Sequence, residues 1–105
     1  MSTLRHYEIL LPLRFNDGQP VTPELVANTM LKLREHFGAV SWESQPIQGQ
    51  WQHEGVVYRD DLVRVFVDVA DTVENRRFFL QFKEQVKTDF QQVDIWLTSY
   101  PIDVL

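Results

Sequence analysis

The first residues whose types could carry chemistry are His6 and Glu8, near the start of the chain. They lie two positions apart in a segment of alternating apolar residues, and side chains two apart on a β-strand point to the same side of a sheet. With Asp68 as a third group, this pair could bind a metal ion or act as a general acid and base. Since such spacing arises by chance in many strands, the simpler interpretation is an exposed polar edge, and we expect no metal and no cofactor.

A second segment gathers side chains of functional type more densely than the rest of the chain. Its members are Trp51, His53, Tyr58, Arg59, Asp60 and Asp61. Aromatic rings, an imidazole and carboxylates close together could bind a polar ligand or a cation. The simpler interpretation is a solvated β-hairpin on which Trp51 and Tyr58 pair across the two strands.

The charge and composition argue against several classes of function. The 105 residues carry a net charge of −5 at pH 7, which disfavours general binding to nucleic acids or to anionic membranes. The chain has no cysteine, so disulfides, thiolate metal sites and cysteine nucleophiles are ruled out. The apolar run at residues 9–13 is too short for a bilayer span or a signal-peptide core. We therefore expect a cytoplasmic protein that binds neither nucleic acid nor a membrane.

The known motifs for phosphate, dinucleotide and hydrolase chemistry are also missing from the sequence. It contains no phosphate-binding loop, dinucleotide fingerprint, nucleophile elbow or zinc-protease pattern. Any function must therefore be inferred from side chains that the fold brings together.

Hydrophobic periodicity predicts the elements that must position these side chains. Alternating apolar residues predict strands, and apolar residues spaced three or four apart predict helices. The expected strands cover residues 6–15, 39–48, 57–69 and 93–100, and the expected helices run from 23 to 37 and from about 71 to 90. The connection at residues 49–55 is bounded by glycines and is either a loop or the tip of a long hairpin.

The ends of both expected helices carry capping residues. Thr22 can cap the first helix, Pro23 suits its first turn and Gly38 suits its end. Asp71 and Glu74 have the spacing of a capping box at the start of the second helix.

Three prolines are expected to limit the strands. Pro12 removes one backbone donor and predicts a bulge or a locally unpaired position in the first strand. Pro46 weakens the far end of the second strand, and Pro101 ends the last one.

The order strand, helix, strand, strand, helix, strand predicts a single α+β domain over residues 1–105. Right-handed crossovers make it a ferredoxin-like β-α-β-β-α-β sandwich, with a four-stranded antiparallel sheet and two helices on one face. The sheet residues expected under the helices are Ile9, Leu11, Val63, Val65, Val67, Ile95 and Leu97. The opposite face, called the open face below, is expected to carry His6, Glu8, Arg64, Phe66, Asp68, Trp96 and Tyr100, with Leu10, Arg14, Glu43 and Thr98 around them.

The open face combines large aromatic side chains with charges of both signs. A surface exposed only to water rarely needs Phe66, Trp96 and Tyr100 together, and contiguous exposed aromatics usually mark an interface or a ligand site. The alternatives are a subunit interface, a ligand site and a partly covered surface, and we favour the interface.

The layout resembles the ferredoxin-like superfold, in particular its dimeric α+β barrel branch. The resemblance implies that two open sheet faces pack together around a cavity, as in monooxygenases, heme-degrading enzymes, muconolactone-type isomerases and stress-responsive proteins. The spacing of Gly49-Gln50-Trp51 and Gly55, followed by Asp60-Asp61 and a valine-rich strand, is also similar to a family of small bacterial proteins without an assigned activity. The fold hosts many functions, and no catalytic residue can be carried over by position.

Three functions are compatible with these features. The first is a non-enzymatic homodimer that binds a small ligand or a protein partner through the open face. The second is a small cofactor-independent enzyme with a cavity between two sheet faces, lined in part by His6, Arg64 and Trp96. The third, an RNA-binding module, is disfavoured by the acidic charge.

Overall fold

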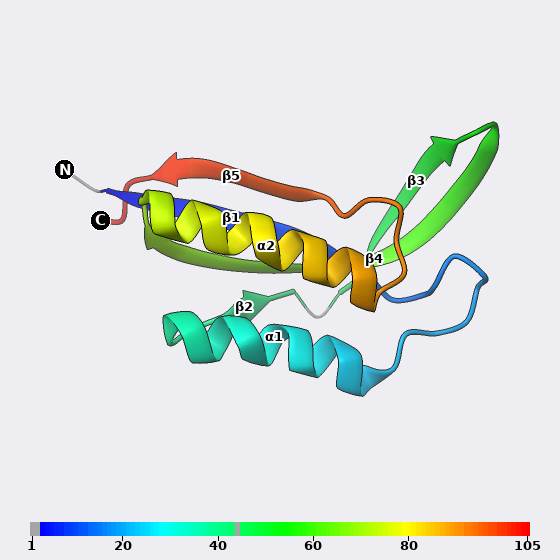
Figure 1. Cartoon of the computed structure of the whole chain (residues 1–105), viewed down its shortest axis with the longest axis horizontal. Coiled ribbons are helices and arrows are strands. Elements are labelled where there is room, and N and C mark those ends of the chain that lie inside the picture. Colours follow the sequence, from blue (N-terminus) through cyan, green and yellow to red (C-terminus); the bar gives the residue numbers. More distant parts are fainter. Residues whose placement is uncertain (1–2, 44) are drawn as a thin grey trace.

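The computed structural model describes residues 3–43 and 45–105, which form two α-helices and one antiparallel β-sheet (Figure 1). The strands are β1 (Leu4–Pro12), β2 (Ser41–Trp42), β3 (Ile47–His53), β4 (Val56–Ala70) and β5 (Leu97–Ile102), and the helices are α1 (Pro23–Phe37) and α2 (Val73–Asp89). The strand order is β2-β4-β1-β5, and β3 pairs with β4 beyond the end of β2. The predicted ferredoxin-like α+β class is confirmed.

The central pair of strands, β1 and β4, sets the two faces of the sheet. Their antiparallel register runs from Leu4 opposite Ala70 to Pro12 opposite Leu62. Residues directly opposite each other share a face, so every second pair belongs to the core. The sheet residues predicted to lie under the helices are buried, and Leu97 is partly buried against them.

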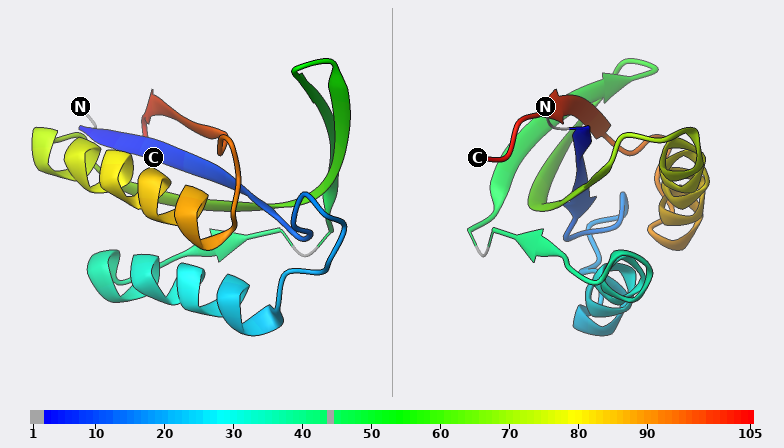
Figure 2. Two further views of the ribbon diagram at one scale, coloured as in Figure 1. Left: turned by 45° about the vertical axis from the view of Figure 1, so that its right-hand side comes forward. Right: turned by 90° about the vertical axis from the view of Figure 1, so that its left-hand side faces the viewer.

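Both helices lie on the same side of the sheet, and the other side has no helix over it (Figure 2). Thr22 caps α1, because its side-chain oxygen accepts a hydrogen bond of 3.2 Å from the backbone N–H of Leu25. Gly38 ends α1 with a φ of 84°, a conformation that costs glycine little. Leu33 from α1 and Phe79 from α2 complete the core with the valines of β4.

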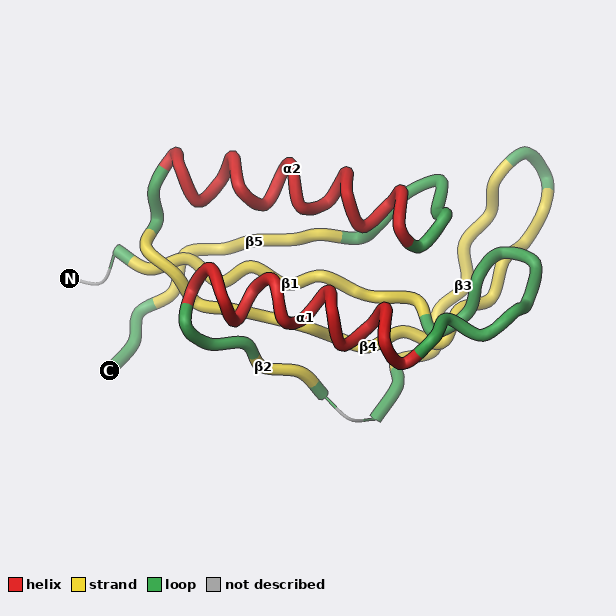
Figure 3. The backbone as a smooth tube through the Cα atoms, turned by 60° about the horizontal axis from the view of Figure 1, so that its bottom comes forward, coloured by secondary structure: helices red, strands yellow, loops and turns green. Residues whose placement is uncertain are grey.

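The second predicted strand, residues 39–48, is wrong in its bounds, and the described sheet has five strands rather than four. Trp42 pairs with Val65 and Ile47 pairs with Leu62, so the sequence between Trp42 and Ile47 is two residues longer than the sequence between Leu62 and Val65. Figure 3 shows β2 and β3 as separate strands. The two extra residues, with a proline at 46, interrupt the ladder. Because the number of extra residues is even, odd-numbered and even-numbered residues keep their faces of the sheet from β2 to β3.

The connection predicted at residues 49–55 is mostly strand, which leaves the long hairpin as the correct alternative. β3 and β4 are joined by a two-residue turn at Glu54 and Gly55, with φ values of 51° and 79°. Two successive positive φ values match the twist of a hairpin. Residues 47–61 form a two-stranded extension that projects beyond the helices, called the arm below (Figure 1).

The first strand also differs from its prediction at both ends. It begins at Leu4 rather than His6 and ends at Pro12 rather than Phe15. Pro12 forms no bulge, because it stays in register opposite Leu62. After it the chain turns back, with a hydrogen bond of 2.8 Å from the Phe15 N–H to the Gln19 carbonyl.

Two further boundaries are corrected by the structure. The cap of α2 is Thr72, whose side chain accepts from the Asn75 N–H at 3.2 Å, while Asp71 instead pairs with Arg5 at 3.0 Å. The last strand is β5 at 97–102 rather than 93–100, and Pro101 lies within it instead of ending it. β5 is an edge strand, where proline is tolerated.

The buried hydroxyl of Tyr7 allows a test of the packing in the core. Tyr7 is buried with its ring stacked on Phe79 at 3.9 Å, and its hydroxyl has no hydrogen-bond partner among the described residues. Tyr7→Phe should raise the free energy of unfolding by about 1 kcal/mol, because an unpaired buried hydroxyl is costly. Urea denaturation measures the change, and a loss of stability would show that the hydroxyl has a partner.

Candidate functional site

His6 is the centre of a line of charged groups that crosses the open face. Its Nδ1 lies 2.6 Å from Asp68 Oδ1 on β4, and its Nε2 lies 3.2 Å from Glu8 Oε1 on β1. The register explains this, because His6 is opposite Asp68, and Glu8 follows two positions later on the same face. The sequence-predicted group of three is therefore brought together.

Two aromatic rings enclose the His6 imidazole. Tyr100, opposite it on β5, stacks on it with ring centroids 4.8 Å apart, and Phe66 lies 5.3 Å away on β4. The residue is only 9% exposed, so the expectation of a polar edge exposed to water is wrong. A carboxylate engages each ring nitrogen, which leaves neither of them directed at open space.

Arg64 extends the line to the edge of the sheet. Its Nε lies 3.1 Å from Glu8 Oε2, an ion pair that lacks hydrogen-bond alignment, and its guanidinium donates to Glu43 Oε1 at 2.8 Å. The hydrogen bond to Glu43 and the charge of Glu8 raise the pKa of Arg64 above its ordinary value. Asp68, His6, Glu8, Arg64 and Glu43 are called the ionic line below.

The ionic line does not have the form of a metal site. Within residues 3–43 and 45–105, no group of three or more histidine or acidic side chains is placed to hold a metal ion. The imidazole lies between the two carboxylates and hydrogen-bonds both, so the three do not point at a common centre.

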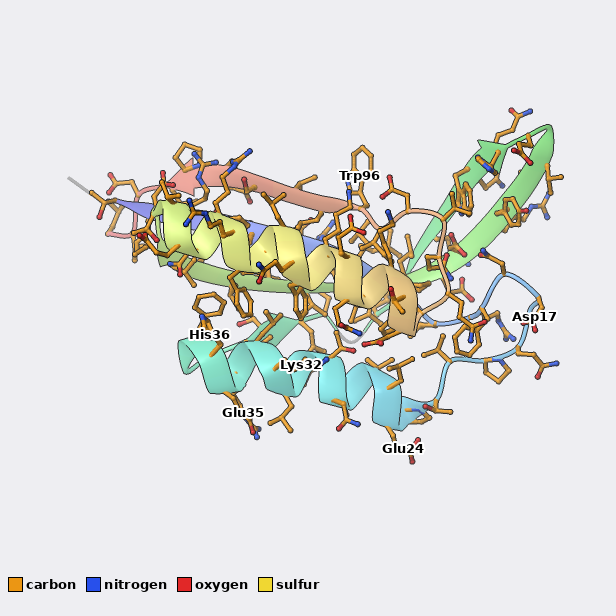
Figure 4. The ribbon with its side chains drawn as sticks, viewed as in Figure 1. Asp17, Glu24, Lys32, Glu35, His36 and Trp96 are labelled. Carbon is orange, nitrogen blue, oxygen red and sulfur yellow. The ribbon has the colours of Figure 1, made fainter. Side chains whose placement is uncertain are left out.

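A cavity of about 480 Å³ lies further along the open face, where the arm diverges from β5. Leu10, Pro12 and Leu62 are lining residues from the central strands, Trp51 and Asp60 come from the arm, and Trp96 precedes β5. Its volume falls within the range of small-molecule sites. Trp96 is 67% exposed and projects away from both helices (Figure 4).

The arm presents an ordered aromatic wall to this cavity. Trp51 stacks on Tyr58 with centroids 4.4 Å apart, which confirms the predicted cross-strand pair. The Trp51 indole N–H donates to Asp60 Oδ2 at 2.6 Å. Gly49 lies opposite Asp60 and two residues before Trp51, so the position beside the indole carries no side chain.

A second carboxylate, that of Asp94, lies at the rim of the cavity. Burial alone would raise the pKa of Asp94, but the Ile95 N–H and the Lys83 ammonium together outweigh it and hold the pKa below its ordinary value. Lys83 Nζ is 3.2 Å from Asp94 Oδ1, so this charge is already paired. Asp60 has no such cationic partner among the ion pairs of the described residues.

The structure sorts the second predicted cluster into two groups. Trp51, Tyr58 and Asp60 share the face of the arm that continues the open face, while Arg59 and Asp61 alternate to the other face. His53 lies near the tip of the arm, 6.3 Å from Trp51 between ring centroids.

Sequence reasoning missed the part of the cavity formed by Leu10, Pro12, Gly49 and Leu62. One signal was available, because a glycine inside a strand often marks the close approach of a ligand or a backbone. The prediction of a connection at residues 49–55 hides this signal, because Gly49 then lies outside any strand.

Comparison with known proteins identifies the fold and no family. No family model and no curated protein sequence matches the chain. Among solved structures it is similar to a phage SAM lyase in complex with S-methyl-5'-thioadenosine, with a TM-score of 0.71, 17% identity, and coverage of 95% of this chain and 82% of the other.

Two proteins named for divalent cation tolerance are also similar. The protein from Thermus thermophilus has a TM-score of 0.63 and 18% identity over 94% of this chain and 84% of its own. The periplasmic CutA from Archaeoglobus fulgidus has a TM-score of 0.63 and 16% identity over 96% of this chain and 85% of its own. Identities this low establish a shared fold and transfer no activity.

Neither helix in the described part of the chain combines the length and the apolar composition that crossing a membrane requires. The expected cytoplasmic location and the expected lack of nucleic-acid binding stay predictions.

The ionic line predicts unequal effects for two similar substitutions. Glu8→Gln should lower the free energy of unfolding by about 1 kcal/mol, because both carboxylate oxygens of Glu8 are engaged and its side chain is only 23% exposed. The matched control Glu43→Gln should lower the free energy of unfolding by less, because the Glu43 side chain is 47% exposed and its ion-pair partner in the ionic line is Arg64. Urea denaturation compares them, and equal losses would contradict the central position of Glu8.

Proposed function

We propose that the protein is a non-enzymatic module that self-associates through its open face and binds a small molecule in the cavity on that face. The observation that carries this proposal is the half-enclosed cavity, whose wall on one side is the exposed Trp96. A second copy packed on the open face would cover Trp96 and close the cavity.

The exposed aromatic surface supports self-association. Trp96 and Tyr100 are 67% and 51% exposed in the single chain, although aromatic side chains of this size contribute strongly when they are buried at interfaces. A standard interface covers about 800 Å² per partner, roughly a tenth of the 7094 Å² surface of this chain. The homodimer is the simplest closed assembly that one self-complementary face can form.

The arm also favours a partner. An isolated two-stranded hairpin is marginally stable in water, and the described pairing of β3 is with β4 alone. Val56 and Val57 near its tip are 50% and 56% exposed. A neighbouring copy that packs against the arm would bury these side chains.

The enzymatic alternative needs a group that can reach a substrate. His6 is the natural general base, but both of its nitrogens face carboxylate oxygens and two rings cover it. A role in holding β4, β1 and β5 together therefore fits His6 better than proton transfer does. The phage SAM lyase, solved with a bound small organic molecule, supports the view that this fold can accommodate such a ligand.

Light scattering tests the self-association directly. The wild-type protein should have a mass of at least twice the 12.4 kDa of one chain. Trp96→Asp should raise the dissociation constant of the assembly by about tenfold or more. A monomer at high protein concentration would contradict the proposal.

Leu80→Asp is the matched control for Trp96→Asp. Leu80 lies on α2 and is 54% exposed, so it carries a similar substitution on the helical side of the molecule. The control should leave the mass unchanged, and dissociation by both variants would mean that the open face is not the specific interface.

A further inference from the structure

We propose that the cavity selects a small, flat organic cation, with its positive charge beside Asp60 and its ring against Trp51 and Trp96. This inference rests on the proposed function, which makes the same cavity a ligand site, and it adds the chemical class of the ligand.

The charges around the cavity are complementary to a cation. Its described lining contains two carboxylates, Asp60 and Asp94, and no lysine, arginine or histidine. Lys83 lies 3.2 Å from Asp94 and compensates that charge. Arg59, next to Asp60 in sequence, alternates to the other face of the arm. Arg14 and Arg59 line a neighbouring pocket that also touches Asp60, but no ion pair joins either of them to it among the described residues. The Asp60 carboxylate is therefore the charge without an ion-pair partner that a ligand would meet.

The aromatic side chains favour a cation for a second reason. Indole has the strongest attraction for cations among the aromatic side chains, and two tryptophans line this cavity. The hydrogen bond from the Trp51 indole N–H to Asp60 holds the ring and the carboxylate in one fixed arrangement. Tyr58 stacks on one side of the Trp51 ring and limits its movement further.

The shape of the site favours a flat organic molecule over a bare metal ion. Metal cations such as Ca²⁺ and Mg²⁺ take six or more oxygen ligands, counting waters, and no described group of acidic side chains is placed to hold one. The remaining walls are apolar, with Leu10, Pro12 and Leu62 among them. Gly49 lies close to Leu62, because an added Cβ would be 3.3 Å from Leu62 Cδ1, so a larger side chain at position 49 would have to displace this lining residue.

Titration calorimetry with three probes of similar shape tests this class. The probes are N-methylquinolinium, which is a permanent cation, quinoline, which is uncharged at neutral pH, and naphthoate, which is an anion. The cation should bind about tenfold more tightly than quinoline, and naphthoate should bind most weakly. NMR of the indole N–H groups should show shifts for Trp51 and Trp96, with Trp42 unchanged as an internal control.

Substitutions in the same chain assign the effect to the cavity. Asp60→Asn keeps an acceptor for the Trp51 N–H but removes the charge. It should therefore weaken the binding of N-methylquinolinium by about tenfold and leave the affinity for quinoline unchanged. The control Glu35→Gln removes a negative charge from α1, on the helical side of the molecule, and should leave the affinities for both probes unchanged (Figure 4). Gly49→Val should weaken the binding of both probes, because its side chain has to displace Leu62 from the cavity wall. If Asp60→Asn does not fold, Trp96→Leu, at an exposed position, should weaken the cation more than quinoline.

The outcomes separate this inference from the proposed function. Quinoline or naphthoate binding as tightly as the cation would overturn the cation class and leave a ligand site in place. Failure of all three probes to bind would overturn the inference, while the mass measured by light scattering would still decide self-association. A monomer that binds the cation at Trp51 and Trp96 would support the inference and contradict the assembly.

Discussion

The antiparallel pairing of β1 with β4 determines which side chains of this protein can meet. It places Ile9 opposite Val65 in the core and His6 opposite Asp68 on the open face. A shift of this register by one residue would turn one of the two strands over relative to the other, which would separate His6 from Asp68 and move the core residues of that strand to the open face. Burial of the valines therefore also fixes the ionic line, because one register produces both.

The unequal lengths of the same two strands produce the cavity. β4 begins at Val56, but its pairing with β1 begins only at Leu62, so residues 56–61 form strand pairs with β3 alone, and the Leu13 N–H adds one hydrogen bond to the Asp61 carbonyl. The sheet narrows there to the two strands of the arm, and the space between the arm and β5 is open. The cavity lies at this step, with its aromatic wall on the arm and the apolar side chains of β1 beneath it.

The sequence predicted the fold well where a local signal and the hydrophobic pattern agreed. Thr22, Pro23 and Gly38 identified α1, and the alternating valines identified β4 and its buried face. Prediction failed where the outcome depends on a distant strand. Pro12 was expected to disturb β1, but whether its missing N–H matters depends on its place in the register with β4.

The open face could also be predicted only in part from the sequence. Alternation placed its seven predicted residues on one side of the sheet. It could not show that Tyr100 and Phe66 cover His6 while Trp96 stays exposed, since that depends on three strands at once. Nor could it show the cavity, because Gly49 contributes only once β3 is known to continue past it.

Trp96 reports directly on whether a second copy covers the open face, as we propose. In a variant with Trp42→Phe and Trp51→Phe, Trp96 is the single tryptophan of the chain. We predict that its fluorescence emission shifts to shorter wavelength, and that quenching by acrylamide falls, as protein concentration rises through the range of assembly. An emission typical of indole in water, with full quenching at every concentration, would show that no second copy covers the open face.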